Sequence, residues 1–343
     1  MALLDDVRLA VGSRIAEGFF NGTARFAGLH PKARPARHGV EVLRDIPYVG
    51  DGKKEHLLDV YRPAGDRGAG ASRDPEGLRP VVLYVHGGGF RILSKESHWL
   101  MGLAYAKRGY VVFNINYRLA PRYPFPMGLE DCAAAFSWVK ANAARHGGDA
   151  SRMVLAGESA GANLVTALTM ALTYERPEPF ARRAFDEGLV PRAVIPACGV
   201  FQVSDIARIR RRKPRMPGFV ADRLHEVERA YIGAHAASPG ISLDLADPLT
   251  VFERGDRPAR NIPPFFLPVG TKDPLLDDTR RLARALEGLG VPVTARYYEG
   301  EVHAFHAFYF REKARACWVD TFQFLDEHCP RQDGDVARGS HEA

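Results

Sequence analysis

The sequence predicts a protein of the α/β class, built on a doubly wound and mostly parallel sheet. Beyond residue 80, short apolar runs alternate with stretches of helical spacing. Runs that are apolar throughout suit strands buried on both faces, and strand–helix alternation favours right-handed crossovers between parallel strands. Strands are expected at Val81–Val85, Val111–Ile115, Met153–Ala156, Ala193–Ala197, Phe265–Val269 and Val293–Tyr298, and helices at 96–108, 129–145, 160–174, 278–289 and 311–327.

The residues before this alternation are expected to supply an N-terminal helix and two more strands. Residues 1–38 begin with the spacing of an amphipathic helix and continue as a Gly- and Pro-rich tether. Strands are then expected at Val40–Val49 and Glu55–Tyr61. The segment Arg62–Pro80 is rich in Gly, Pro and charged residues, so we expect an exposed loop there.

Residues 201–262 interrupt the alternation and predict a cap. They contain a basic run, Arg208–Arg215, followed by a helical stretch near 219–233. An insertion of this length between two strands is most simply placed over the C-terminal edge of the sheet, where open α/β sheets bind their ligands. The N-terminal helix is expected to join this cap.

The composition fits a soluble globular protein. Of 343 residues, 46% are apolar and 26% are charged. The formal net charge of +6, from 47 basic and 41 acidic residues, is too modest to suggest a nucleic-acid partner. No apolar run approaches the roughly 20 residues that span a bilayer, and no secretory signal is recognised. We therefore expect a cytoplasmic protein without stable membrane insertion.

The four cysteines are expected to be reduced and mostly structural. Cys132, Cys198, Cys317 and Cys329 form no CxxC pair, and their spacing does not match a secreted disulfide framework.

The segment Gly157-Glu158-Ser159-Ala160-Gly161 predicts a nucleophilic serine. It follows one expected strand and opens the expected helix 160–174. A sharp strand-to-helix turn needs small residues beside the serine, and it projects the hydroxyl out of the sheet towards a substrate. The helix N-terminus adds backbone donors and the positive end of a dipole for a developing oxyanion.

The segment His86-Gly87-Gly88-Gly89-Phe90 predicts further donors for the same chemistry. It directly follows the expected strand Val81–Val85. Acyl transfer needs backbone N–H groups aimed at the tetrahedral oxyanion, and glycines let the chain approach it closely. A Gly-rich loop that only turns the chain is the alternative. The serine motif downstream favours the oxyanion interpretation.

A serine nucleophile also needs a base and an orienting carboxylate, because a free serine hydroxyl is weakly nucleophilic. In this sheet type the expected chain order is serine, acid, histidine. Asp273 comes shortly after the expected strand Phe265–Val269, and His303 comes shortly after the expected strand Val293–Tyr298. We therefore expect both side chains at the same sheet edge as Ser159.

Other residues are alternative candidates for the base and for the acid. His306 is an alternative base, although it is expected about one turn into the last helix. Asp277 and Asp278 are alternative acids, although they are expected to open the helix after Asp273. Asp273 followed by Pro274 is also compatible with a plain turn.

With these segments in place, the chain resembles the bacterial hormone-sensitive-lipase-like family of α/β-hydrolases. Tyr117-Arg118-Leu119-Ala120-Pro121, then Tyr123–Pro126 and Glu130–Cys132, is similar to a run that this family has after its fourth strand. Asp273-Pro274-Leu275 with Asp277 resembles the family's acid motif. The chain departs from the family at Glu158, Asn116 and Ala304, where Asp or Thr, Asp, and Gly respectively are usual.

The resemblance implies an α/β-hydrolase fold with a sheet of about eight strands, a helical cap, and no metal or organic cofactor. It implies Ser159, Asp273 and His303 as the catalytic triad, and the N–H groups of Gly88, Gly89 and Ala160 as the oxyanion hole. His86 and Glu158 would support the site. The implied domains are an N-terminal cap segment at 1–40, a catalytic domain in two parts at 41–200 and 263–330, a cap insertion at 201–262, and a flexible tail at 331–343.

The expected function is hydrolysis of small-molecule carboxylic esters, with short to medium acyl chains, through an acyl-enzyme on Ser159. An amidase or formamidase with the same triad is the alternative within this class. A ligand-binding receptor on a hydrolase scaffold is disfavoured, because all three triad candidates are present. The basic run is interpreted as a solvated cap face, with capture of an acidic substrate as the alternative. A homodimer is left open.

Overall fold

The computed structural model describes residues 28–65, 77–233 and 242–330, together with 11, 12, 14, 15, 17, 18, 22, 23 and 26. Most of the expected N-terminal helix and the whole expected tail at 331–343 therefore lie outside the described residues. The described residues from 11 to 29 are helical.

Eight strands form one sheet in the order β1-β2-β4-β3-β5-β6-β7-β8. The pairs β1–β2 and β2–β4 are antiparallel, and every other neighbouring pair is parallel. The predicted α/β class and mostly parallel sheet are thus confirmed. The strands are β1 (Val40–Pro47), β2 (Leu57–Pro63), β3 (Arg79–Val85), β4 (Val111–Ile115), β5 (Gly148–Glu158), β6 (Ala193–Ala197), β7 (Phe265–Gly270) and β8 (Val293–Tyr298).

The helices fill the connections between these strands. They are α2 (Trp99–Ala106), α3 (Met127–Asn142), α4 (Ala160–Thr173), α5 (Pro179–Asp186), α6 (Ala207–Arg212), α7 (Gly218–Tyr231), α8 (Pro248–Arg254), α9 (Leu276–Gly288) and α10 (Glu312–His328). Short 3-10 helices are η1 (Pro31–Ala33), η2 (Pro35–His38), η3 (Lys54–His56), η5 (Ala143–His146) and η7 (Phe305–Ala307).

The predicted elements match this order, and the misses are short helices. The five predicted helices correspond to α2, α3, α4, α9 and α10, and the stretch near 219–233 corresponds to α7. The sequence analysis did not predict α5, α6 and α8, which have only 8, 6 and 7 residues. Such lengths show about two turns or less, too few for apolar spacing to stand out.

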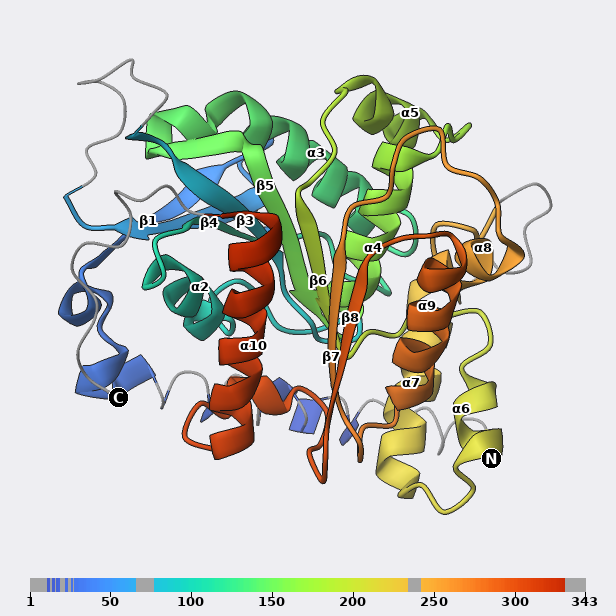
Figure 1. Cartoon of the computed structure of the whole chain (residues 1–343). Helices are drawn as coiled ribbons and strands as arrows, with labels where there is room; N and C mark the ends of the chain where they lie inside the picture. The colour runs from blue at the N-terminus through green and yellow to red at the C-terminus, as the bar shows by residue number, and fades with distance from the viewer. Residues whose placement is uncertain are drawn as a thin grey trace.

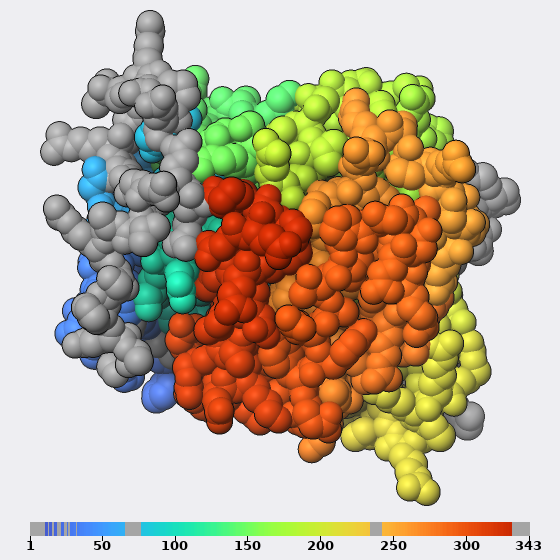
Figure 2. Space-filling model, viewed as in Figure 1, coloured from blue at the N-terminus to red at the C-terminus, as the bar shows by residue number. Residues whose placement is uncertain are grey.

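Helices cover both faces of the sheet, and consecutive strand residues alternate between the two resulting cores. In β3, Val81, Leu83 and Val85 face one core, which contains apolar residues of α3, α4 and α9. Val82 and Tyr84 face the other core, which contains residues of α2 and α10. Figure 1 shows α10 (red) and α2 lying side by side in front of the strands. In the space-filling view, α10 and neighbouring C-terminal residues hide the sheet on this side (Figure 2).

The C-terminal ends of the parallel strands all lie at one edge of the sheet. Open α/β sheets bind their ligands at this edge. Figure 1 shows α6 and α7 (yellow) together at the lower right, beyond the lower end of α9. None of the helices among the described residues combines the length and the apolarity that a membrane crossing requires.

Candidate active site

Ser159 occupies the sharp turn between β5 and α4. Its backbone has φ 55° and ψ −114°, a conformation that a residue with a Cβ rarely adopts. Its N–H donates to the carbonyl of Ala197 at the end of β6, at 2.9 Å. Gly161 is required here, because a Cβ at this position would collide with the carbonyl oxygens of Val85 and His86. The turn therefore sits directly on the end of β3, as a nucleophile elbow does.

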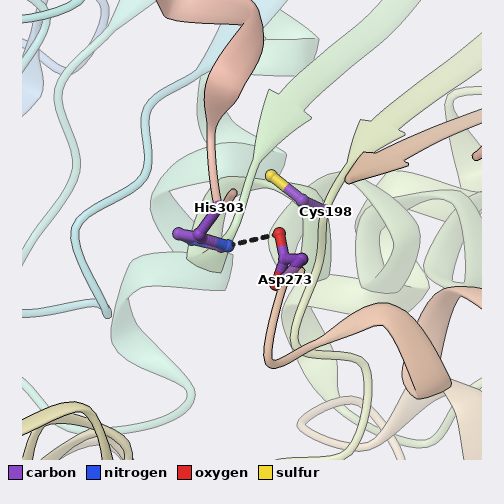
Figure 3. Close-up of side chains that lie close together, drawn as sticks. All are labelled: Cys198, Asp273 and His303. Carbon is purple, nitrogen blue, oxygen red and sulfur yellow. Dashed lines mark hydrogen bonds and ion pairs between the residues drawn. The ribbon is translucent and has the colours of Figure 1, made fainter. Parts of the chain in front are cut away.

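Asp273 and His303 meet at the ends of β7 and β8. His303 Nδ1 lies 2.8 Å from Asp273 Oδ2 (Figure 3). The other carboxylate oxygen, Oδ1, accepts a hydrogen bond from the N–H of Leu275 at 2.7 Å. Asp273 is fully buried, whereas the side chain of His303 is 35% exposed. The carboxylate is thus held from both sides and presents one oxygen to the imidazole.

The charge of Asp273 dominates the protonation of His303. Burial by itself would lower the pKa of the imidazole, but the Asp273 carboxylate, with Cys198 beside it, raises that pKa well above its ordinary value of 6.5. A histidine with this partner is poised to accept a proton from an adjacent hydroxyl and to be stabilised as the cation.

Gly88 and Gly89 turn the chain beside the serine after β3. Gly88 has φ 109°, and a Cβ there would collide with the carbonyl oxygen of Ile92. Gly89 has φ 60°. Ala160 is the first residue of α4, so its N–H has no carbonyl acceptor within that helix. All three N–H groups belong to segments that flank Ser159.

His86 is buried and braces the glycine loop. Its Nδ1 lies 2.7 Å from the carbonyl oxygen of Gly87, and its ring stacks on Tyr117 with centroids 4.4 Å apart. The Tyr117 hydroxyl in turn donates to the carbonyl of His86 at 3.0 Å. Burial, and then the neighbouring His98, lowers the pKa of His86 to about 3. These contacts connect the enclosed imidazole to the glycine loop and to Tyr117.

Glu158 links two histidines behind the serine turn. Its Oε1 lies 2.9 Å from His98 Nε2, and its Oε2 lies 2.9 Å from His306 Nε2. All three side chains are buried. Burial by itself would raise the pKa of Glu158, but the charges and contacts of His98 and His306 outweigh it and hold that pKa well below its usual range. The carboxylate therefore ties β5 to the segments before α2 and before α10.

The expectation that His306 lies one turn into the last helix is wrong. His306 belongs to η7, and α10 begins only at Glu312. Its Nε2 faces Glu158 and not Asp273. Asp277 and Asp278 do lie in the first turn of α9, as expected. Of the two candidate bases, the structure brings His303 to Asp273.

A single large cavity is lined by both Ser159 and His303. Residues of α7 also line this cavity. One of them, Val227, is so close to Gly89 that a Cβ on that glycine would lie 2.8 Å from Val227 Cγ2. The aromatic side chains of Phe308, Tyr309 and Phe310 are exposed and line the cavity. Phe305, in the same segment, is buried core.

The basic run divides into one buried anchor and an exposed face. Arg208 is buried, and its Nη2 donates to Asp278 Oδ1 at 2.6 Å. The interpretation as a solvated face is therefore wrong for Arg208. It holds for Arg211 and Arg212, which are exposed and pair with the acids Asp205 and Asp277 respectively.

Lys213, within this run, reaches the site itself. Its Nζ donates to the backbone carbonyl of Asp273 at 2.5 Å, and the residue lines the cavity.

Cys198 is a site neighbour that the sequence analysis missed. It directly follows β6, is 1% exposed, and lies beside the Asp273–His303 pair (Figure 3). One donor atom from each of Cys198, Asp273 and His303 falls within 4.8 Å of the others, the spacing of residues that could hold a metal ion. The signal was present in the sequence, because Cys198 follows its strand as Asp273 and His303 follow theirs.

Known proteins show the family and share the fold. A family model described as the alpha/beta hydrolase fold matches residues 82–307. Carboxylesterase NlhH of Mycobacterium tuberculosis is 31% identical over 231 residues, which are 66% of this chain and 66% of the relative, slightly under two thirds of its length. A hyperthermophilic esterase of the archaeon Pyrobaculum calidifontis has a similar structure, with a TM-score of 0.67 and 25% identity over 92% of this chain and 93% of that one.

A second solved structure has a similar fold. It is an esterase from the bacterial hormone-sensitive lipase family, with a TM-score of 0.63 and 22% identity over 91% of this chain and 98% of that one.

Proposed function

The chain belongs to the α/β-hydrolase fold family, and on this premise we propose that it is a carboxylesterase that works through an acyl-enzyme on Ser159. One observation carries the proposal. A serine in a strained strand-to-helix turn and a histidine paired with a buried carboxylate line the same cavity, from the C-terminal ends of strands in one sheet. The similar proteins described above, a carboxylesterase and esterases, support an ester as the substrate.

In the proposed mechanism, His303 takes the proton of Ser159 while Oγ attacks the ester carbonyl. Asp273 keeps the proton on Nδ1, so that Nε2 is free to act as the base, and it stabilises the imidazolium that forms. The N–H groups of Gly88, Gly89 and Ala160 would hold the oxyanion of the tetrahedral intermediate. His303 then protonates the leaving alcohol and activates the water that hydrolyses the acyl-enzyme.

We propose a small-molecule ester of short to medium acyl length as the substrate, handled in the cytoplasm without stable membrane insertion. The mixed lining of the cavity suits a molecule with both apolar and polar parts, such as an ester, because aromatic side chains and charged groups share its walls. The region 201–262, with α6 and α7, would act as the cap that bounds the acyl chain.

The test is the turnover of chromogenic acyl esters by the wild-type protein and by Ser159→Ala. The variant should lose at least about 10⁴-fold in kcat, since a triad serine acts as a unit with its base. Ser151→Ala is the matched control, because Ser151 lies in the same strand and its hydroxyl donates to a nearby carboxylate, that of Asp149, at 2.7 Å. Undiminished turnover by Ser159→Ala, with its fold intact by circular dichroism, would exclude the proposed nucleophile.

A panel of acyl esters from two to about sixteen carbons, with one matched amide, defines the substrate class. Esters of short to medium length should be the best substrates. Faster turnover of the amide than of the ester with the same acyl group would replace the esterase by an amidase.

A further inference from the structure

We propose that Cys198, Asp273 and His303 form a binding site for a thiophilic divalent cation such as Zn²⁺, and that an ion bound there inhibits the protein. The binding step is independent of the proposed esterase activity, whereas the inhibition step rests on it. The ion would act as an inhibitor that competes for the histidine, and not as a cofactor of the reaction.

The three ligands come from three adjacent parallel strands. Cys198 follows β6, Asp273 follows β7 and His303 follows β8, so the sheet itself brings them to one point (Figure 3). The three donor atoms, a sulfur, a carboxylate oxygen and a ring nitrogen, all lie within 4.8 Å of one another. Among the described residues, this is the one group of at least three Cys, His, Asp or Glu residues that meets this spacing.

The donor set is the one that zinc prefers. Thiolate, imidazole and carboxylate are its usual protein ligands, with bond lengths of about 2.0–2.3 Å. Around a tetrahedral ion, such bonds place neighbouring donor atoms about 3.5 Å apart. The separation between the sulfur and its neighbours would therefore shrink by about 1.3 Å at most, and the 2.8 Å contact between His303 Nδ1 and Asp273 Oδ2 would open by about 0.7 Å. Water would complete the coordination.

The backbone of Cys198 is fixed in an uncommon conformation. Its φ is 42°, in the left-handed region that residues with a Cβ seldom occupy. Its N–H donates to the carbonyl of Pro268 in β7 at 3.0 Å, and the preceding residue, Ala197, accepts from Ser159. The turn that carries the sulfur is thus anchored to the strands on both sides, so little ordering would accompany binding.

An ion can reach these ligands from the cavity. His303 is 35% exposed and lines the cavity with Ser159, whereas Cys198 and Asp273 lie behind it and are buried. The buried acid supplies one negative charge and the thiol supplies a second when it loses its proton. The divalent charge would then be balanced within the site, which offsets the cost of burying the ion.

The proton balance explains why binding would inhibit. The Cys198 thiol gives its proton to solvent as the sulfur–zinc bond forms. The imidazole binds zinc through Nδ1, so the Nδ1 proton leaves that atom. In the neutral ring it moves to Nε2, and in the cation it goes to solvent, so Nε2 carries a proton in both cases. Nε2 is the atom that must accept the Ser159 proton in the proposed mechanism, and it no longer has a free lone pair. The serine therefore stays protonated.

The binding test measures Zn²⁺ affinity by competition with a chromophoric chelator. The wild-type protein should bind one ion per chain, and Cys198→Ala should weaken this binding at least about tenfold, since even changes outside the ligand set cost that much. Cys329→Ala is the matched control. Cys329 is an equally buried cysteine at the opposite end of the sheet, where its sulfur contacts the carbonyl of Arg152 in β5. Equal affinities of wild type and Cys198→Ala would overturn the proposal.

A spectroscopic measurement on the wild-type protein tests the thiolate ligand even if the Cys198→Ala variant misfolds. Co²⁺ occupies zinc sites and gives a sulfur-to-metal charge-transfer absorption only when a thiolate is bound. This absorption should appear in the wild type and in Cys329→Ala. Its absence from the wild type would equally exclude Cys198 as a ligand.

The inhibition test compares each protein with its own metal-free activity. Half-inhibition of wild type and of Cys329→Ala should occur at the Zn²⁺ concentration that half-saturates the site, and Cys198→Ala should need at least about ten times more. Equal sensitivity of all three proteins would overturn the inhibition step.

Ser159→Ala separates this proposal from the proposed function. The variant cannot turn over esters in the proposed mechanism, yet it should bind Zn²⁺ as tightly as wild type does. Normal zinc binding by a wild-type protein without esterase activity would refute only the proposed function. Normal esterase activity without zinc binding would refute only the metal site.

Discussion

Different interactions hold two regions of the molecule in place. One is the strand-end site, which consists of Ser159, Asp273 and His303, and the other is the cover formed by α6 and α7. At the strand ends, backbone hydrogen bonds and sheet topology position Ser159, Asp273 and His303. The cover depends mainly on side chains, although a backbone hydrogen bond from the N–H of Phe125 to the carbonyl of Tyr231, at 2.7 Å, also holds α7. Arg91 pairs with Glu226 at 2.8 Å, Phe90 stacks on Tyr231 with centroids 3.7 Å apart, and Arg208 is buried against Asp278.

Because of this difference, we expect the strand-end site to determine the rate of the reaction and the cover to determine which substrate is preferred. A site built on strand ends keeps its geometry because moving one of its residues would mean shifting a strand of the sheet. A cover held by a few ion pairs and one stacked ring can change through single side chains, without disturbing the sheet. Substitutions at the strand ends should therefore act mainly on kcat, and substitutions in the cover mainly on which ester is preferred.

The largest effect in this comparison is expected from Asp273→Asn. The amide would leave the imidazole in the wrong tautomer, and in triads of this type that costs about 10³–10⁴-fold in kcat. Steady-state kinetics on the best ester measures it. Asp277→Asn is the control, because Asp277 lies four residues on and pairs with Arg212 at the surface. A greater loss in Asp277→Asn would transfer the role of the acid to Asp277.

A smaller loss is expected from Glu158→Gln, which acts through its neighbours. Without its charge, His98 and His306 lose their common partner, and a shift of the serine turn by a fraction of an ångström should lower kcat up to about 10²-fold while KM changes little. Asp131→Asn is a matched control, since Asp131 is another buried acid in contact with a histidine, His56, but lies outside the cavity lining. If both variants lose kcat in proportion to their loss in Tm, Glu158 is only structural.

The pH profile should show the raised pKa of His303. The base works only when the imidazole is neutral, so kcat/KM should rise about tenfold per pH unit up to a limb above the ordinary histidine value of 6.5. The profile is measured with a chelator present. Asp273→Asn should move the limb to lower pH, because the charge that raises the pKa is gone. A wild-type limb at or below 6.5 would contradict the pairing.

The smallest effect is expected from the cover, with Val227→Ala. Removing the methyl groups that approach Gly89 would enlarge the cavity beside the proposed oxyanion hole and favour longer acyl chains, by about two- to tenfold in relative kcat/KM. The acyl panel measures the shift. Val319→Ala, on the exposed face of α10, should leave the preference unchanged. A collapse of kcat for every ester would mean that the cover also holds the catalytic geometry.

The sequence by itself determined the fold class, the family and the strand-end positions of the proposed triad. These features depend on local patterns. Apolar runs specify buried parallel strands, and parallel strands bring their C-terminal ends to one edge whatever packs around them. The expected strands Val111–Ile115, Ala193–Ala197 and Val293–Tyr298 match β4, β6 and β8 residue for residue.

Tertiary structure alone decided which distant side chains meet. His306 faces Glu158, Arg208 is buried against Asp278, and Cys198 lies beside His303. Each of these contacts joins segments that no short pattern connects, and each depends on how the helices and loops pack after the sheet has formed. Sequence periodicity reports whether a residue faces a core. It does not report which side chain a residue contacts there, and at this site that contact decides whether a side chain supports the loop, anchors the cover or would bind the proposed ion.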